Sequence, residues 1–283
     1  MGAEIADGKG LASSIEKTIS QGTAELSEEG VSPHLAVVIV GEDPASRVYV
    51  RNKQRACERC GIKNTLIEMP EGSTQQEVIE VVERLNSDAS VHGILVQSPI
   101  PGDVDELAVA YAISPMKDVD GFNPANLGRL VQGDLSGLLP CTPAGVIRLL
   151  EHSGIQFSGA RAVVLGRSRI VGMPMSLMLA SKGVDATVTI VHSRTQNVES
   201  ICRDSDIIIA AMGIPHAVKA DWVKPGAYVV DVGISRAEDG GLAGDVDPQV
   251  VEVAGWITPV PGGVGPMTIA MLMENTLTAA RKV

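Results

Sequence analysis

The stretch that decides the fold is residues 162–174, which reads AVVLGRSRIVGMP. Its first four residues form an apolar run of the kind found in buried strands. A glycine-containing turn follows at 166–172, and Pro174 marks a helix start because proline is favoured in the first helical turn. A strand, turn and helix in this order direct backbone N–H groups toward a pyrophosphate. The stretch therefore favours a dinucleotide-binding α/β unit.

The glycine turn alone does not decide between cofactor binding and a plain connection. The usual fingerprint has three glycines, and here Ser168 stands at the second position, between Gly166 and Gly172. The end of the next strand, 192–195, reads HSRT and lacks the acidic residue that meets the ribose of NAD. Hydroxyls and a cation there, with Arg167, favour the extra phosphate of NADP, although NAD stays possible. The alternative to a phosphate site is that residues 192–195 are only a solvent-exposed strand end.

Outward from this stretch, short apolar runs alternate with helical patterns. Alternation of this kind predicts parallel sheets with crossover helices, an α/β fold. The segment 117–140 is rich in Gly, Pro, Asn and Asp, and we interpret it as a functional loop and domain junction. A capping-box pattern begins at Ser73, Asp103 precedes a short helix, and a last helix is expected over 266–281. The expected strands are 35–40, 65–69, 91–97, 161–165, 186–191, 206–210 and 227–232.

Composition excludes several classes of function. The net charge of −11 argues against a nucleic-acid surface, which needs Lys and Arg to neutralise phosphates. No apolar run reaches the roughly 20 residues of a membrane helix, and no signal peptide is evident. The pair Cys57 and Cys60 lacks further ligands for zinc, and the five histidines are not at metal-ligand spacing, so no metal is expected. Reduced cysteines and the missing signal predict a cytoplasmic protein.

Tyr49 and Lys53 stand four residues apart on the helix expected after the first strand. Residues at this spacing lie on one helix face, so the phenol and the ammonium can reach one site. Tyr-x-x-x-Lys is also a signature of short-chain dehydrogenases, where it follows the dinucleotide turn. Here it precedes that turn, which rejects the short-chain assignment. When the pair is considered by itself, the alternative to a functional site is that Tyr49 and Lys53 lie on a solvent-exposed helix face.

Seven motifs occur in one order along the whole chain, and together they resemble the tetrahydrofolate dehydrogenase/cyclohydrolase family. Any one of them is modest evidence, whereas the full series is highly specific. The motifs are GEDPAS at 41–46 leading to Tyr49 and Lys53, GILVQSPIP at 93–101, KDVDGF at 117–122, PCTP at 140–143, GRSRIVG at 166–172, HSRT at 192–195 and TPVPGGVGPMT at 258–268.

The resemblance implies a two-domain α/β protein whose last helix returns to the first domain. The folate-binding catalytic domain would comprise residues 1–141 plus 263–283, and a Rossmann-like NAD(P)-binding domain would comprise 142–262. The implied activities are NADP-dependent oxidation of 5,10-methylenetetrahydrofolate and hydrolysis of the methenyl product to 10-formyltetrahydrofolate. The family also implies a homodimer that acts on tetrahydrofolate derivatives.

The resemblance also implies residue roles. Lys53 would be the general acid/base, since burial or a cationic product can bring a lysine pKa down from about 10.4. Gln97 would hold it, Tyr49 would pack on the folate, and Asp120 would accept hydrogen bonds from the pterin. Further substrate-binding candidates are Pro261, Gly262 and Gly263, and the cofactor-binding candidates are Gly166, Arg167, Ser168, Gly172, Ser193, Arg194 and Ile234.

Two positions depart from the commonest family pattern, namely Ser98 after the glutamine and Met173 after the turn. Neither removes a residue type needed for catalysis. Two other functions stay open from the residues: a non-catalytic sensor of folate or dinucleotide, and a two-domain dehydrogenase of the shikimate type. A sensor has no need of a poised lysine, which speaks against the first.

Overall fold

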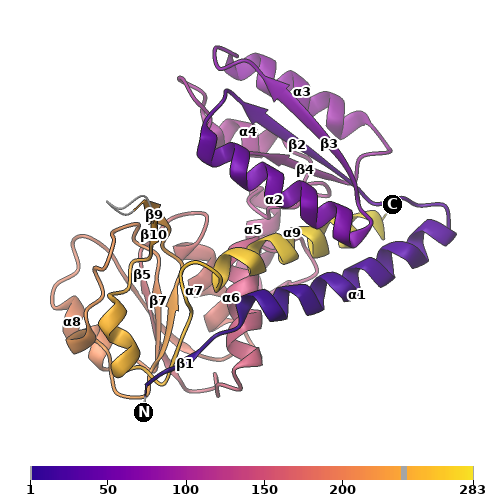
Figure 1. The fold of residues 1–283 in the computed structure, drawn as a ribbon. Helices are drawn as coiled ribbons and strands as arrows, with labels where there is room; N and C mark the ends of the chain where they lie inside the picture. The colour runs from indigo at the N-terminus through magenta and orange to yellow at the C-terminus, as the bar shows by residue number, and fades with distance from the viewer. Residues whose placement is uncertain (1, 237–240, 283) are drawn as a thin grey trace. The chain divides into compact units, whose positions relative to one another are not determined.

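The computed structural model describes residues 2–236 and 241–282, which form two compact units. One unit combines Met1–Ala12 with Thr142–Thr268 and contains a six-stranded sheet, so we call it the six-stranded unit. The other combines Ser13–Cys141 with Ile269–Val283 and contains a three-stranded sheet, and we call it the three-stranded unit. Both sheets are parallel, so the predicted two-domain α/β class is confirmed (Figure 1).

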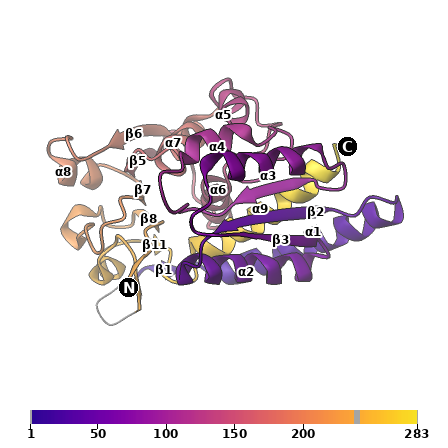
Figure 2. The ribbon, with the colours of Figure 1, turned by 90° about the horizontal axis from the view of Figure 1, so that it is seen from above.

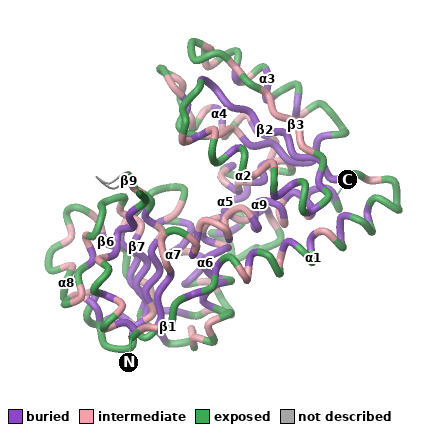
Figure 3. Tube along the Cα trace, in the orientation of Figure 1, coloured by how far each residue is buried: buried purple, intermediate pink, exposed green. Residues whose placement is uncertain are grey.

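The three-stranded unit is built around one fully buried strand. In the sheet order β3-β2-β4, every residue of the central β2 is buried (Figure 3), as expected for a parallel strand covered on both faces. On one face Ala36, Val38 and Val40 pack with apolar residues of α3 and α4. Helix α2 covers the opposite face (Figure 2). The elements carried by this part of the chain are α1 (Gly8–Glu28, which starts in the other unit), β2 (His34–Val40), α2 (Pro44–Cys60), β3 (Lys63–Met69), α3 (Gln75–Ser87), β4 (Gly93–Val96), α4 (Glu106–Ala112) and α5 (Pro124–Val131).

Helix α2, which carries Tyr49 and Lys53, has well-defined ends. The Asp43 carboxylate accepts a hydrogen bond from Ser46 N at 2.7 Å, and Pro44 occupies the first helical position. Gly61 ends the helix in the left-handed conformation with φ 70°, which favours glycine. These caps fix which residues of α2 face the sheet.

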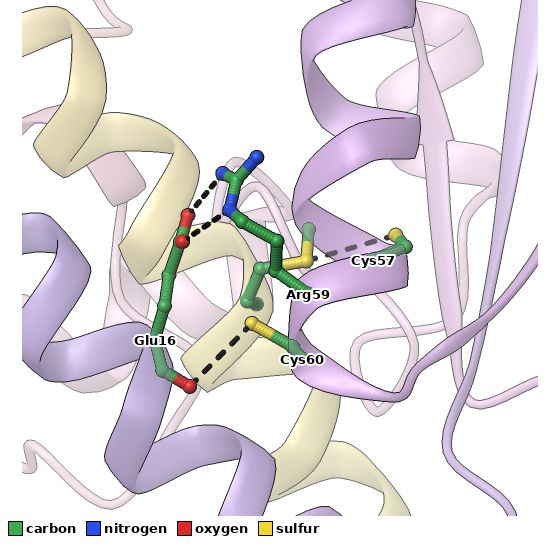
Figure 4. A network of polar contacts seen from close by, with 5 residues as sticks. Glu16, Cys57, Arg59 and Cys60 are labelled. Atoms are coloured by element: carbon green, nitrogen blue, oxygen red, sulfur yellow. Dashed lines mark hydrogen bonds and ion pairs between the residues drawn. The ribbon is translucent and has the colours of Figure 1, made fainter.

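Figure 4 shows how α2 is fixed to α1 and α9 (Val264–Ala280). Arg59 donates two hydrogen bonds to the carboxylate of Glu16, at 2.6 and 2.7 Å. Glu16 is buried, so this two-point pairing compensates the carboxylate for lost hydration. Cys60 and Cys57 contact the backbone of Glu16 and the sulfur of Met273. Both cysteines are free and buried, and burial raises the pKa of each thiol to about 12.

Three helix starts differ from the sequence expectation. The capping box of α3 uses Thr74 and Glu77, one residue after the predicted pair, and α4 is capped by Asp105 instead of Asp103. Helix α5 lies inside the segment that we read as a loop, where Asn123 caps a proline start. The turn-like composition of 117–140 concealed this cap, because Asn-Pro also begins turns.

The six-stranded unit has the strand order β1-β11-β8-β7-β5-β6, with all pairs parallel. Strand β5 coincides with the predicted strand 161–165, and β6, β7 and β8 lie within predicted runs. The chain leaves β5 toward β6 on one side and then returns to β7 on the other, which makes the β5–β7 edge a topological switch point. The elements are β1 (Glu4–Ile5), α6 (Cys141–His152), β5 (Arg161–Leu165), α7 (Gly172–Ala180), β6 (Thr187–Val191), α8 (Val198–Arg203), β7 (Ile207–Ala210), β8 (Tyr228–Asp231), β9 (Ser235–Arg236), β10 (Leu242–Ala243), β11 (Trp256–Ile257), two short 3-10 helices (Ala220–Trp222 and Pro248–Glu252) and the start of α9.

Strands β1 and β11 were not predicted, because each is two residues long and gives no periodic signal. Their pairing places the N-terminal residues beside Trp256 and Ile257. The compact units therefore begin and end at other residues than the predicted domains, since residues 2–12 and 263–268 belong to the six-stranded unit. Which ligand each domain binds stays a prediction at this point.

Candidate active site

The structure brings Lys53 and Gln97 into direct contact. Lys53 Nζ donates a hydrogen bond to Gln97 Oε1 at 2.9 Å. The other end of the amide is also held, because Gln97 Nε2 donates to Ser98 O at 2.6 Å. Gln97 directly follows β4, and its backbone N–H donates to Val38 O in the neighbouring strand. The sheet therefore sets the position of the amide, and the amide orients the amine.

Asp120 lies close enough to Lys53 for their charges to interact, on a loop that runs beside β4. Asp118 forms a parallel bridge with Ile94, and Ile94 N donates to Lys117 O. Gly121 follows with φ 79°, and a side chain there would meet the backbone of Leu139 at 2.4 Å. Only glycine allows this approach.

The buried carboxylate of Asp118 shapes the loop that carries Asp120. It accepts hydrogen bonds from Gly121 N at 3.2 Å, Asn123 N at 2.7 Å and the Asn126 side chain at 3.0 Å. Burial raises the pKa of Asp118, and these donors oppose the rise. A buried carboxylate with three donors is a rigid support, so the backbone around Asp120 is defined before any ligand binds.

Burial shifts the protonation equilibria of Lys53 and Asp120 toward their uncharged forms. Burial lowers the pKa of Lys53 from its ordinary value, while the carboxylate of Asp120 opposes part of the shift. Burial likewise raises the pKa of Asp120, and the Lys53 ammonium opposes this rise. Both groups are thus displaced toward neutrality, the direction that suits proton transfer near pH 7.

Two residues that sequence reasoning did not assign to the site lie beside Asp120. Cys141 Sγ is 3.1 Å from Val119 O, and burial raises its pKa well above the ordinary value. Asn275 on α9 donates to Val119 O and Leu139 O, both at 2.8 Å. The sequence gives no distinct signal for Asn275, which lies between two other polar residues, Glu274 and Thr276. Its two carbonyl partners, and Cys141 Sγ at 3.5 Å, are brought to it only by tertiary packing.

Tyr49 lies one helical turn before Lys53 on α2 and is 40% exposed. This is a large exposed side chain in a protein with few aromatics. The structure therefore leaves its ring accessible to a ligand, and its packing on the folate stays a prediction.

The carboxyl end of β5 in the six-stranded unit carries the glycine turn. Gly166 has φ 116°, and a side chain there would lie 2.2 Å from Ala211 O. A side chain at Gly172 would lie 2.3 Å from Gly166 O, so the turn packs directly on the start of α7. Ser168 Oγ accepts hydrogen bonds from Val171 N and Gly172 N, at 3.1 and 3.3 Å. Serine at the second fingerprint position thus stabilises the turn.

The remaining cofactor-binding candidates lie at strand ends of the same sheet. Arg167 is exposed in the turn after β5, and Ser193 and Arg194 are exposed after β6. The turn after β6 is held by His192 N donating to Thr195 Oγ1 at 3.0 Å. Ile234 is exposed, three residues beyond the end of β8. A close-packed glycine turn flanked by exposed guanidinium groups and hydroxyls fits a phosphorylated dinucleotide.

Pro261, Gly262 and Gly263 form the turn before α9 in the six-stranded unit. Gly262 has φ 110°, and a side chain on Gly263 would meet Pro259 O at 2.7 Å. A side chain on Gly8 would lie 2.1 Å from Gly263 O. Gly262 is therefore required by its backbone conformation and Gly263 by close packing within the unit.

Among residues 2–236 and 241–282, no group of three or more His, Cys, Asp or Glu could hold a metal ion. In the same part of the chain, no helix has the length and apolar character to cross a membrane.

Comparison with protein families gives two matches that cover most of the chain. Residues 6–120 match the catalytic domain of tetrahydrofolate dehydrogenase/cyclohydrolase. Residues 140–283 match the NAD(P)-binding domain of the same family.

Individual relatives are similar along their full length. The bifunctional protein FolD of Moorella thermoacetica is 52% identical over 283 residues, which is 100% of both chains. The crystal structure of the bifunctional methylenetetrahydrofolate dehydrogenase/cyclohydrolase from Campylobacter jejuni is 45% identical, with a TM-score of 0.96 and 99% of each chain covered. The Trypanosoma brucei dehydrogenase-cyclohydrolase, crystallised with NADP cofactor and inhibitor, is 40% identical, with a TM-score of 0.94 over 100% of this chain and 98% of that chain.

Proposed function

The chain belongs to the tetrahydrofolate dehydrogenase/cyclohydrolase family, and from this premise we propose that Lys53, Gln97, Asp120 and Tyr49 carry its chemistry. The observation that supports the proposal most strongly is the hydrogen bond from Lys53 Nζ to Gln97 Oε1, with the carboxylate of Asp120 close enough to interact with the same amine. Family membership also decides against the two alternatives, a non-catalytic sensor and a shikimate-type dehydrogenase.

The protein is a bifunctional enzyme, a methylenetetrahydrofolate dehydrogenase and a methenyltetrahydrofolate cyclohydrolase. The first reaction removes a hydride from the one-carbon unit of 5,10-methylenetetrahydrofolate, and bound NAD(P)+ supplies the hydride acceptor. The second reaction adds water to the methenyl cation and breaks one carbon–nitrogen bond to give 10-formyltetrahydrofolate, with release of a proton.

Lys53 is the general acid/base of the hydrolysis in our proposal. Its neutral amine takes a proton from the attacking water, which leaves a neutral carbinol. Opening the ring then requires a proton to pass from the carbinol hydroxyl to the departing nitrogen, and Lys53 is placed to carry it. The burial that lowers the Lys53 pKa favours the neutral amine that this step needs. The contact with Gln97 orients the amine.

Asp120 and Tyr49 bind the folate in the same proposal. The Asp120 carboxylate accepts paired hydrogen bonds from the amino-pyrimidine edge of the pterin. Those donors would stabilise the charged form and offset the pKa rise that burial causes. The exposed Tyr49 ring packs against the folate near the reacting carbon. Pro261, Gly262 and Gly263 remain further candidates for substrate contact.

For the cofactor we propose Gly166, Arg167, Ser168, Gly172, Ser193, Arg194 and Ile234 as the binding residues, with NADP preferred over NAD. The support is the exposed cations and hydroxyl groups at the ends of β5 and β6, with no carboxylate in HSRT. Arginine can bind a phosphate through two hydrogen bonds.

Substitution of Arg167 tests this preference. Arg167→Ala should raise KM for NADP+ about tenfold or more, since a charge-assisted hydrogen bond contributes roughly 1.5–3 kcal/mol. The KM for NAD+ should change much less. Arg161→Ala removes an exposed arginine at the opposite end of β5 and is the matched control. Equal losses for both cofactors would contradict the 2′-phosphate assignment.

The domain and assembly predictions remain part of the proposal. We assign folate binding to residues 1–141 plus 263–283 and NAD(P) binding to 142–262.

A homodimer is supported by β6, an edge strand with Thr187, Thr189 and Ile190 exposed, because unpaired strands readily associate. A cytoplasmic location is supported by four free, buried cysteines. Light scattering on the purified chain would decide between monomer and dimer.

The activity is tested by mixing the purified chain with 5,10-methylenetetrahydrofolate and either NADP+ or NAD+. Reduced cofactor and methenyl absorbance should both rise, and the methenyl signal should then decay as it is hydrolysed. Absence of both signals with either cofactor would refute the dehydrogenase function.

A further inference from the structure

Two buried carboxylates in the six-stranded unit take no part in the chemistry described so far. Asp231 is the last residue of β8, and Asp245 follows β10. Asp231 is 4% exposed and Asp245 is fully buried. Within the described part of the chain, Asp245 Oδ1 has no hydrogen-bond partner. Buried carboxylates are costly unless donors surround them, so their partners indicate what they hold in place.

Asp231 fixes the position of Asp245. Its Oδ1 accepts hydrogen bonds from Asp245 N at 2.9 Å and from Gly233 N at 3.0 Å. Its Oδ2 accepts one from Val246 N at 2.9 Å. A side chain on Gly244 would lie 1.9 Å from Asp231 Oδ2, so this segment passes directly over the carboxylate. The backbone of Asp245 is therefore tied to the end of β8.

Asp245 in turn holds the loop that follows β7. Its Oδ2 accepts hydrogen bonds from two consecutive backbone donors, Met212 N at 2.6 Å and Gly213 N at 2.9 Å. The same two segments are also joined by backbone hydrogen bonds, from His216 N to Gly244 O and from Val218 N to Asp245 O, both at 3.0 Å. One oxygen atom thus fixes the first turn of the loop.

This loop lies against the glycine turn. Ala211 N donates to Leu165 O at 2.9 Å, and a side chain on Gly166 would lie 2.2 Å from Ala211 O. The contact falls at the carboxyl ends of β5 and β7, the switch point where ligands bind in parallel α/β sheets. A shift of residues 211–213 would displace the backbone on which the dinucleotide turn rests.

We propose that Asp245 is a positioning residue for the dinucleotide: through Met212 N and Gly213 N it holds the β7 loop against the Gly166 turn, and Asp231 holds Asp245. The inference rests on NAD(P) binding by the six-stranded unit. It assigns Asp245 no contact with the cofactor and no part in the hydrolysis of methenyltetrahydrofolate.

Two substitutions at Asp245 test this role. Asp245→Asn keeps the side-chain shape but weakens the acceptor and places an NH2 group in a buried position, whereas Asp245→Ala leaves both backbone donors without a partner. Asp247→Asn is the matched control, because Asp247 lies two residues further on and instead accepts from Gln249 N and pairs with Lys219. The Kd for NADP+ is measured by calorimetry, and methenyl hydrolysis is measured without dinucleotide.

Asp245→Asn should raise the Kd for NADP+ at least tenfold, with methenyl hydrolysis within twofold of the unsubstituted chain. Hydrogen exchange at the amides of Met212 and Gly213 should accelerate in the absence of cofactor, a readout that does not depend on activity. Asp247→Asn should leave both values unchanged. If Asp245→Ala does not fold, the nearly isosteric Asp245→Asn decides the question.

An unchanged Kd in folded Asp245→Asn would overturn the inference. A parallel loss of NADP+ binding and methenyl hydrolysis would also overturn it, because Asp245 would then support only the fold. Failure of the unsubstituted chain to bind either dinucleotide would overturn the cofactor assignment itself.

Discussion

At the residue scale, the chemistry depends on one amine whose surroundings lower its pKa. Lys53 donates to the neutral amide of Gln97 rather than to a paired carboxylate, so its first partner does little to stabilise the charged form. Asp120 does stabilise that form, yet burial has the larger effect. The neutral partner at position 97 is therefore central to the balance.

Gln97→Glu tests this balance. A carboxylate in contact with the ammonium favours its charged form, so the pKa of Lys53 should rise. Because the neutral amine takes the proton, the limb of the pH–rate profile that reports Lys53 should move to higher pH, and hydrolysis at pH 7 should fall about tenfold for each pKa unit. The profile of kcat/KM for methenyl hydrolysis is the measurement. An unshifted profile would show that another group controls the limb.

Sequence motifs could indicate Lys53, Gln97 and Asp120, because each lies in a segment whose pattern is specific. The supporting residues could not be found in this way. Asn275 acts on backbone carbonyls more than 130 residues earlier in the chain, and Asp245 acts on backbone N–H groups of a distant loop. Such contacts depend on tertiary packing and leave no local signal.

At the element scale, the length and composition of three strands and one helix explain where the prediction succeeded and where it was wrong. Strand β5 was predicted to the residue because its four apolar residues after Arg161 are continuous and end at Gly166. Strands β1 and β11 are too short to show periodicity, and they form because the neighbouring strands supply their backbone partners, β11 for β1 and both β1 and β8 for β11. Helix α5 was missed because its start, Asn123-Pro124, has the composition of a turn.

Two histidines at the start of the strands in the three-stranded unit make its stability depend on pH. His34 begins β2, and His92 N donates to His34 O just before β4. Burial lowers the pKa of both imidazoles. At His34, Lys63 adds to this effect, while the Ser90 carbonyl and Asp88 oppose it. At His92, Lys117 adds to it. The folded state therefore holds both rings neutral at a pH where the unfolded chain binds protons.

The free energy of unfolding should thus be unaffected by these rings above pH about 6.5 and should decrease as the pH falls below it. Each ring lowers the free energy of unfolding by at most about 1.4 kcal/mol for each pH unit between its unfolded pKa and its lowered folded pKa. Urea unfolding at pH 7.5 and 5.5 measures the difference, which His92→Gln should reduce. His152→Gln, at an exposed position, is the control. Equal pH dependence in all three chains would contradict this origin.

At the scale of the whole molecule, two parallel sheets carry two different sets of functional loops. The three-stranded unit supplies an amine, an amide and a carboxylate, and the six-stranded unit supplies a glycine turn with cationic neighbours. The chain crosses between the units more than once, at Ala12, Cys141 and Thr268. This repeated crossing explains why a linear domain boundary is hard to read from sequence alone.

Each ligand should accordingly protect the loops of its own unit. NADP+ alone should slow hydrogen exchange at 166–172 and 211–213, because a bound ligand stabilises the state that holds it. A folate analogue alone should protect 118–121 and the amide of Gln97. Peptide-resolved hydrogen exchange with each ligand separately is the measurement. Protection of 118–121 but not of 166–172 by NADP+ would contradict the assignment.

The most direct measurement of the central claim is methenyltetrahydrofolate hydrolysis by Lys53→Met. The substitution keeps an unbranched side chain but removes the proton carrier, so the rate should fall roughly 100-fold or more, the range of general acid–base catalysis. The Kd for NADP+ and the far-ultraviolet circular dichroism should stay as in the unsubstituted chain. Hydrolysis retained at the original rate in the folded variant would contradict the account.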